Sequence, residues 1–256
     1  MIDNAPAISL IVPAWNEERV LKSVVHQILK VVDSRFLEYE ILLVNDGSSD
    51  ATGAIMEALG RESARIRVFH NERNMGLGSS YMRGVAAARY EYVMMLCGDG
   101  GIPAKSLPPI FDAIGTADIV VPYVTNLRRI KSRGRFLISR TYTVLLNRVF
   151  GLRLKYYNGL PVHRLELVKA LEVKSEGFGV QGEILVKLIK LGYSYVEIGV
   201  KGAEKSRRSS ALKLKNVTSV TKTLVSLPWQ VHRLTRSPQS FSRAPEASKR
   251  MPARLE

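Results

Sequence analysis

The first hundred residues alternate continuously apolar runs with longer segments whose apolar residues recur every three or four positions. The first pattern is typical of strands buried on both faces, and the second of helices that bury one face. Strands are predicted at 8–14, 39–46, 65–71 and 92–99, and helices at 17–33, 48–63 and 76–89. This order predicts an α/β fold with a Rossmann-like, mostly parallel sheet and helices on both faces.

The second half is less regular but continues the pattern. Strands are predicted at 117–123, 158–164 and 193–200, and helices at 133–150, 180–192 and 211–227. After Pro228 the apolar periodicity stops and Ser, Arg and Pro become frequent, which is typical of disorder. We therefore predict one domain over 1–230, with halves at 1–115 and 116–230. A basic, disordered tail is predicted over 231–256, most clearly from 237 onward.

Ligands of parallel sheets bind beyond the carboxyl ends of the strands, where the strand order switches. That rule brings three polar segments to one edge of the sheet: Pro13–Glu17, Asp46–Ser49 and Asp99. Asp99 lies in a glycine-rich turn and is preceded by the only cysteine, Cys97, in YVMMLCGDGGIP. We expect this edge to carry the binding site.

Composition sets the compartment. Apolar residues make up 46% of the chain, enough for an ordinary core. A single cysteine excludes an internal disulfide and suits a reducing compartment. The N-terminal segment lacks the features of a signal peptide, and no apolar run approaches the ~20 residues that span a bilayer. We expect a cytoplasmic protein that is peripheral to the inner face of the membrane.

The net charge of +15 is unevenly distributed. Residues 119–165 contain ten Lys and Arg and no acid, and residues 201–256 contain thirteen against three Glu. Such asymmetry indicates an anionic partner, either a phosphate ligand, an anionic membrane or nucleic acid, with a solvated surface as the alternative. No specific nucleic-acid partner is expected, because no recognition motif is present and aromatic residues do not interleave with the C-terminal basic run.

The predicted helix 133–150 combines positive charge with apolar residues. Its members are Arg133, Arg135, Arg140, Phe136, Leu137, Ile138, Tyr142, Leu145 and Leu146. A basic amphipathic helix of this kind suits an anionic membrane surface. The alternative is a helix that faces the core and exposes only a basic edge.

Four motifs in order carry a family resemblance: VPAWNEE, LLVNDGSSDAT, RNMGLGSSYMRGVAAAR and LCGDGGIP. Together they resemble family-two inverting glycosyltransferases of the GT-A fold. The later segments SEGFGVQGEILVKLIKLGYSYVEIGV and EKSRRSSALKLKNV resemble the dolichol-phosphate mannose synthase and polyprenyl-phosphate glycosyltransferase branch. The resemblance covers roughly 7–225. It implies transfer of a sugar from GDP-mannose or a UDP-hexose to a polyprenyl or dolichyl phosphate at the membrane.

The resemblance also implies a set of site residues. Those implied to bind the nucleotide-sugar are Pro13, Ala14, Trp15, Glu17, Val44, Asp46, Gly76, Gly78, Gly98 and Arg208. Those implied to act in catalysis are Asp99, Glu183 and Lys205, with Asp99 also holding Mg²⁺ or Mn²⁺.

The Asp-x-Asp motif of the family is reduced here, because its first aspartate is replaced by Cys97. Mg²⁺ keeps several waters and needs only one or two carboxylates besides the phosphates of its substrate, so Asp99 could suffice once a diphosphate is bound. We expect Cys97 to be a packing residue, since thiolates suit softer metals. The reduced motif also permits a catalytically weakened or metal-independent relative that only binds a nucleotide-sugar.

The acceptor decides whether a base is needed. A lipid phosphate is anionic near neutral pH and needs none, whereas a saccharide hydroxyl must lose a proton. Glu183 is the candidate base in the second case, and an ion-paired or capping acid in the first. Lys205 would neutralise the leaving diphosphate. An arginine that the branch places after the fifth strand aligns near Val124, where Asn126 or Arg128 could replace it.

Overall fold

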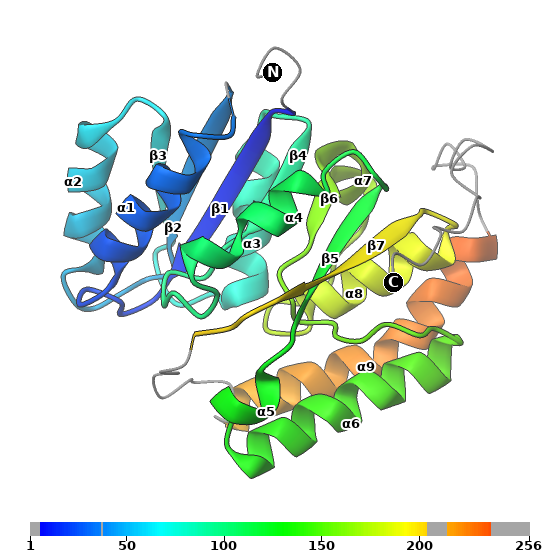
Figure 1. Cartoon of the computed structure of the whole chain (residues 1–256). Helices are drawn as coiled ribbons and strands as arrows, with labels where there is room; N and C mark the ends of the chain where they lie inside the picture. Colours follow the sequence, from blue (N-terminus) through cyan, green and yellow to red (C-terminus); the bar gives the residue numbers. More distant parts are fainter. Residues whose placement is uncertain (1–5, 37, 204–213, 237–256) are drawn as a thin grey trace.

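A seven-stranded sheet forms the centre of the computed structural model, which describes residues 6–36, 38–203 and 214–236 (Figure 1). The strands are β1 Ile8–Ala14, β2 Tyr39–Asn45, β3 Ile66–His70, β4 Tyr92–Met95, β5 Ile119–Val124, β6 Val162–Arg164 and β7 Tyr195–Val200. Their order in the sheet is β3-β2-β1-β4-β6-β5-β7. β6 pairs antiparallel with β4 and β5, and the other pairs are parallel. The predicted α/β class with a mostly parallel sheet is confirmed.

Helices cover both faces of this sheet. They are α1 Leu21–Val32, α2 Thr52–Glu62, α3 Leu77–Ala87, η1 Ala104–Ser106, α4 Pro108–Asp112, α5 Leu127–Ile130, α6 Arg133–Phe150, α7 Leu165–Ala170, α8 Val180–Lys190 and α9 Leu214–Arg236. In Figure 1, α1 and α4 lie in front of the sheet and α3 and α8 behind it. This cover explains why every residue of β1, β2 and β4 is buried. The long helices α6 and α9 lie side by side below the sheet (Figure 1).

The start of α1 differs from the prediction. The helix begins at Leu21, not at Glu17, because the carbonyl of Glu17 accepts the N–H groups of both Val20 and Leu21 at 3.0 Å and so closes a turn first. Glu17 therefore precedes the helix by a full turn. The predicted helix start at residue 17 was therefore wrong by four residues.

Two predicted strands are shorter than expected. β4 ends at Met95, because the chain then turns with a bond from the N–H of Gly100 to the carbonyl of Cys97 and a left-handed Gly100. Within the predicted strand 158–164, Leu160 has a positive φ of 58°, and only the last three residues extend as β6.

The C-terminal helix is longer than predicted. α9 continues through Pro228 to Arg236, so the residues from 231 to 236 are helical and do not belong to a disordered tail. The reason is burial: Leu227 and Val231 are both core residues, four positions apart, and they hold the helix against the domain beyond the proline. The remainder of the predicted tail, 237–256, lies outside the described residues. No described helix is long and apolar enough to cross a bilayer.

Candidate active site

The loops that follow β1 and β2 are fastened to each other. The N–H of Asn16, whose φ is 56°, donates to Oγ of Ser48 at 3.0 Å, and the N–H of Glu17 donates to Oγ1 of Thr52 at 2.8 Å. These bonds fix the backbone of the two residues that follow Trp15, whose side chain is exposed at the edge of the sheet. Trp15 and the partly buried Glu17 thus both keep solvent-accessible surface at this edge.

The carboxylate of Asp46 is hydrogen-bonded within the protein. It is buried and accepts three N–H groups, from the side chain of Asn71 at 2.9 Å and from the backbone of Met75 at 2.8 Å and Gly76 at 3.0 Å. The described contacts therefore hold the loop before α3 in place. Its predicted contact with the nucleotide stays a prediction.

Gly76 and Gly78 permit a close approach of two loops. A Cβ at Gly78 would lie 2.2 Å from the carbonyl oxygen of Ser175, and one at Gly76 would lie 2.5 Å from that of Glu176. The N–H groups of Gly78 and Ser79 both donate to the carbonyl of Glu176, at 2.8 and 3.2 Å. These N–H groups are satisfied inside the protein, so both glycines serve the packing of the two loops. Their predicted contact with the nucleotide-sugar stays a prediction.

Four other residues that were predicted to bind the nucleotide-sugar are buried beneath this edge of the sheet. Pro13, Ala14, Val44 and Gly98 are all buried. A Cβ at Gly98 would lie 2.8 Å from Cβ of Ala14, so the glycine allows β1 and the end of β4 to meet. The side chain of Val44 is 0% exposed, and its predicted contact with the base stays a prediction.

Asp99 is the exposed carboxylate at this edge. It lies in the turn after β4, where its Oδ1 accepts the N–H of Gly101 at 2.9 Å. Burial raises the pKa of the neighbouring Cys97 thiol, and the carboxylates of Asp99 and Glu17 raise it further. The thiol therefore stays protonated, which agrees with a packing role.

The segment that enters residues 204–213 lies against the Asp99 turn. The N–H of Ala203 donates to the carbonyl of Gly101 at 3.2 Å. The Asn126 amide exchanges two bonds with the backbone of Gly202, at 2.8 and 3.1 Å. Asn126 was considered as a substitute for an arginine. In the structure its side chain binds the backbone of Gly202 and so fixes the segment that leads into residues 204–213. Lys205 and Arg208 lie outside the described residues.

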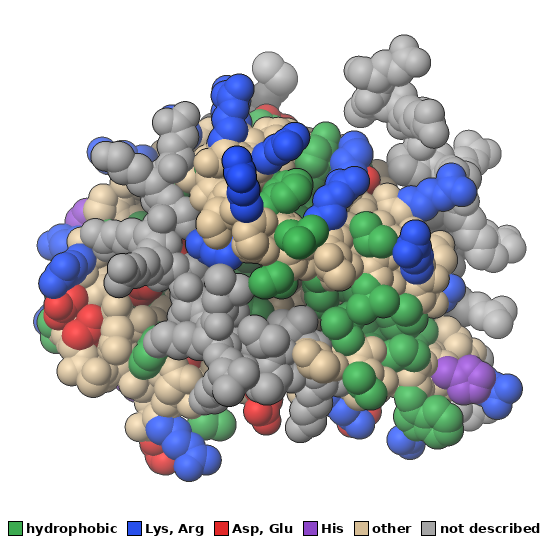
Figure 2. All heavy atoms as spheres, turned by 90° about the horizontal axis from the view of Figure 1, so that it is seen from below, with side chains coloured by type: hydrophobic (Ala, Val, Ile, Leu, Met, Phe, Trp, Pro, Cys, Tyr) green, Lys and Arg blue, Asp and Glu red, His purple; other side chains and the backbone are tan. Residues whose placement is uncertain are grey.

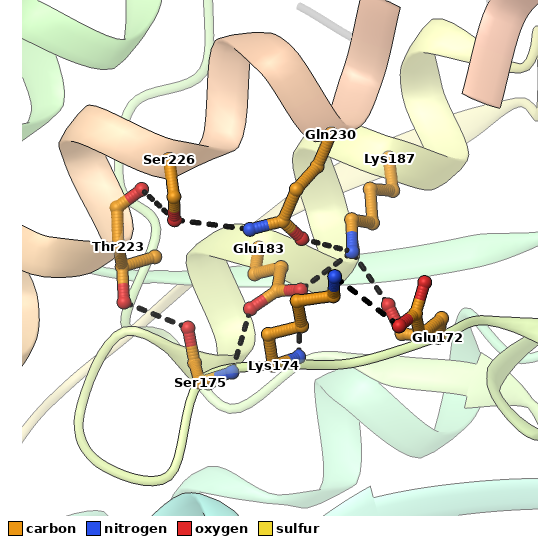
Figure 3. A network of polar contacts seen from close by, with 8 residues as sticks. All are labelled: Glu172, Lys174, Ser175, Glu183, Lys187, Thr223, Ser226 and Gln230. Carbon is orange, nitrogen blue, oxygen red and sulfur yellow. Dashed lines mark hydrogen bonds and ion pairs between the residues drawn. The ribbon is translucent and has the colours of Figure 1, made fainter. Parts of the chain in front are cut away.

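Glu183 lies in the interior, at the start of α8 (Figure 3). Its side chain is 0% exposed, forms an ion pair with Lys187, and accepts the N–H groups of Lys174 and Ser175 at 2.9 Å each. Burial by itself raises the pKa of Glu183, but the bonds from Lys187, Ser175 and Lys174 outweigh it and hold the pKa below its usual value. An enclosed carboxylate that is paired with a lysine matches the ion-paired role that was the alternative to a base.

The same network reaches α9. Lys187 also donates to the carbonyl of Glu172 and to Oε1 of Gln230, the latter at 2.8 Å, and the hydroxyls of Ser175 and Thr223 share a bond of 2.8 Å. Figure 3 shows these groups converging from α8, α9 and the loop between α7 and α8. Sequence reasoning missed the network, although the four-residue spacing of Glu183 and Lys187 was a signal for their pairing.

Residues 9–163 match the family described as Glycosyl transferase family 2. The chain belongs to this family. An undecaprenyl-phosphate mannosyltransferase from Micrococcus luteus is 24% identical over 238 residues, covering 86% of this chain and 95% of the relative. An undecaprenyl-phosphate 4-deoxy-4-formamido-L-arabinose transferase from Edwardsiella ictaluri is 30% identical over 166 residues, covering 64% of this chain and 51% of the relative.

A solved structure shares the fold. Glucosyl-3-phosphoglycerate synthase from Mycobacterium tuberculosis, in complex with Mn²⁺, UDP-glucose and phosphoglyceric acid, superposes with a TM-score of 0.65. It is 21% identical, and the match covers 89% of this chain and 80% of that one. This structure confirms the predicted GT-A fold. The family match confirms the predicted glycosyltransferase, and the relatives agree with the predicted polyprenyl-phosphate glycosyltransferase-like branch.

The fit of a divalent cation to this family 2 glycosyltransferase depends on one group. Across 6–36, 38–203 and 214–236, no three His, Cys, Asp or Glu side chains gather as a ready cation site. The exposed carboxylate of Asp99 fits a hard cation that takes its remaining ligands from water and a diphosphate. The residues present are thus compatible with Mg²⁺ or Mn²⁺ held jointly with a substrate.

Proposed function

We propose that the protein transfers a hexosyl group, with inversion, from GDP-mannose or a UDP-hexose to a polyprenyl or dolichyl phosphate at the cytoplasmic face of a membrane. The observation that carries the proposal is the state of Glu183. The candidate base is enclosed and ion-paired, and so is poorly placed to take a proton from a hydroxyl. A phosphate acceptor needs no base. The names of the polyprenyl-phosphate relatives support the same acceptor.

In this reaction a phosphate oxygen of the acceptor attacks the anomeric carbon of the sugar. The bond from that carbon to the diphosphate breaks, and the nucleoside diphosphate leaves with the electron pair. Trp15 and Glu17 would border the nucleotide, and Asp99 would hold the cation on the diphosphate. The cation supplies charge neutralisation as the leaving group develops negative charge. Lys205, in the segment that follows the Asp99 contact, would add a positive charge to the same group.

The test is transfer of label to lipid. The purified protein is mixed with radiolabelled GDP- and UDP-sugars, polyprenyl phosphate in detergent and Mg²⁺ or Mn²⁺, and the organic phase is counted. We expect label in the organic phase with one donor, lost on omission of polyprenyl phosphate. Label that appears only on an added saccharide would replace this proposal with transfer to a glycan hydroxyl.

A second candidate is a relative that binds the nucleotide-sugar without turning it over. Cys97 in place of an aspartate, and the lack of three gathered metal ligands in the described residues, favour it. Single-turnover measurement decides between the two. Enzyme in excess over labelled donor and acceptor either releases nucleoside diphosphate, which excludes the binding-only role, or returns the donor intact.

A further inference from the structure

Exposed apolar side chains gather on the outer faces of α6 and α9. Of the nine large apolar side chains that are exposed in the described part of the chain, seven lie on these two helices. Six of them define what we call the α6–α9 surface: Leu137, Ile138, Leu145, Val149, Val225 and Trp229. Figure 2 shows a cluster of green side chains with blue ones around it on this side of the molecule.

The exposure of this surface follows from how α9 is held. Its inner face is occupied by Thr223 and Gln230, which bind Ser175 and Lys187, and by the core residues Leu227 and Val231. Val225 and Trp229 fall on the opposite side of the helix, and each is 76% exposed. Single exposed apolar side chains are common, but a group of them on one face marks an interaction surface.

The charged side chains on the two helices are of one sign. Neither α6 nor α9 contains an Asp or Glu. The exposed side chains of α6 include Arg133, Arg140 and Arg148, and those of α9 include Arg233 and Arg236. Basic residues beside aliphatic side chains and a tryptophan are the composition of helices that lie in the interface of an anionic bilayer.

We propose that the α6–α9 surface binds the surface of an anionic lipid bilayer. The surface lies on the side toward which β5 runs, since its carboxyl end leads through α5 into α6 (Figure 1). The carboxyl-end edge with Asp99 therefore faces the same side. A bilayer on this side would bring a lipid phosphate to the site, and this part of the inference rests on the proposed function. The binding of the α6–α9 surface to the bilayer does not rest on it.

The first test measures flotation with vesicles that contain neither donor, metal nor polyprenyl phosphate. The full chain is mixed with vesicles of phosphatidylcholine alone or with phosphatidylglycerol. We expect binding to the anionic vesicles that weakens as salt rises. The double variant Arg133→Gln/Arg140→Gln should bind about 30-fold more weakly, from about 1 kcal/mol per basic residue. The control Lys30→Gln/Arg61→Gln removes the same charge from exposed positions on α1 and α2 and should match the parent within about twofold.

The second test measures the contribution of the apolar side chains of the α6–α9 surface to vesicle binding. In a Trp15→Phe background Trp229 is the one remaining tryptophan, and its emission should shift to shorter wavelength on anionic vesicles. Ile138→Gln/Trp229→Gln, in the parent, should lower binding about tenfold or more and leave the melting temperature unchanged, because both side chains are exposed.

Three results would overturn the proposal. They are absence of flotation, equal loss in the Lys30/Arg61 control, and a parent dimer that Ile138→Gln/Trp229→Gln converts to a monomer without any vesicle binding. The last would assign the surface to a second copy of the chain. Flotation with the vesicles, together with no label on polyprenyl phosphate in the transfer assay, would contradict the proposed function. It would leave this inference intact, because flotation is measured with vesicles that carry no acceptor.

Discussion

Replacing Glu183 with glutamine separates a structural carboxylate from a catalytic one. The substitution keeps the size of the side chain but removes its charge and one of its acceptor sites. Lys187 would keep the Glu172 carbonyl and Gln230 as neutral partners, and an amide NH₂ would face a backbone N–H of Lys174 or Ser175. Removing one partner of a buried ion pair costs about 3–5 kcal/mol. The total stability of a domain is only about 5–15 kcal/mol, so the loss should be plain.

The measurement is urea unfolding followed by circular dichroism at pH 7.5. We expect Glu183→Gln and Lys187→Met each to lower the free energy of unfolding by about 3–5 kcal/mol. The double variant Glu183→Gln/Lys187→Met removes both charges and should lose clearly less than the sum of the singles, because neither charge is left unpaired. That non-additivity identifies the pair itself as the cause.

The lipid-labelling activity of Glu183→Gln can refute the structural role of this carboxylate. If the variant is assayed where it is fully folded, a positioning role predicts that lipid labelling falls by less than about tenfold. A general base predicts a fall of about 10²-fold or more. Unchanged stability together with a fall of that size would show that Glu183 takes a proton, and would move the acceptor from a phosphate to a hydroxyl.

Three further predictions test other parts of the site and core. Asp99→Ala should abolish the cation-dependent thermal stabilisation by the donor, about 2.7 kcal/mol at 100 times its Kd, while leaving the free protein as stable, since the side chain is exposed. Burial lowers the pKa of His163 from 6.5 to about 4, so the unfolded chain binds the extra proton and stability falls as pH drops through that window. Between pH 7.5 and pH 4 the parent should lose about 3 kcal/mol more than His163→Leu in urea unfolding, and equal losses would contradict the assignment. Gly78→Ala should cost about 1–3 kcal/mol, because its Cβ would lie 2.2 Å from the carbonyl of Ser175. Gly134→Ala, with open space around its Cβ, is the matched control and should not destabilise.

The fold was largely readable from local pattern. Largely apolar runs such as β1 and β2 predict buried strands because burial on both faces leaves few polar positions, and α6 was predicted with its observed bounds. The prediction failed where tertiary packing overrode a local rule. Pro228 suggested the end of α9, yet burial of Leu227 and Val231 against the domain outweighs the lost backbone bond.

The sequence predicted where the candidate site residues lie, but not which contacts each of them makes. The carboxyl-end rule placed Asp99 and Trp15 at the exposed edge, as the structure does. It could not assign partners to Asp46, because Asn71 and the N–H of Met75 are brought to it by the course of the loop before α3. Contacts between segments far apart in the chain leave no periodic signal in either one.

One chain of contacts connects the features that sequence motifs indicated separately. Thr223 of α9 binds Ser175, and the next residue, Glu176, accepts the N–H of Gly78. Two positions earlier the N–H of Gly76 donates to Asp46, at the end of β2. A displacement of α9 would therefore be felt through hydrogen bonds and close-packed glycines at the donor edge. The glycines of the third motif belong to this path because only a residue without a side chain lets the 175–177 loop approach so closely.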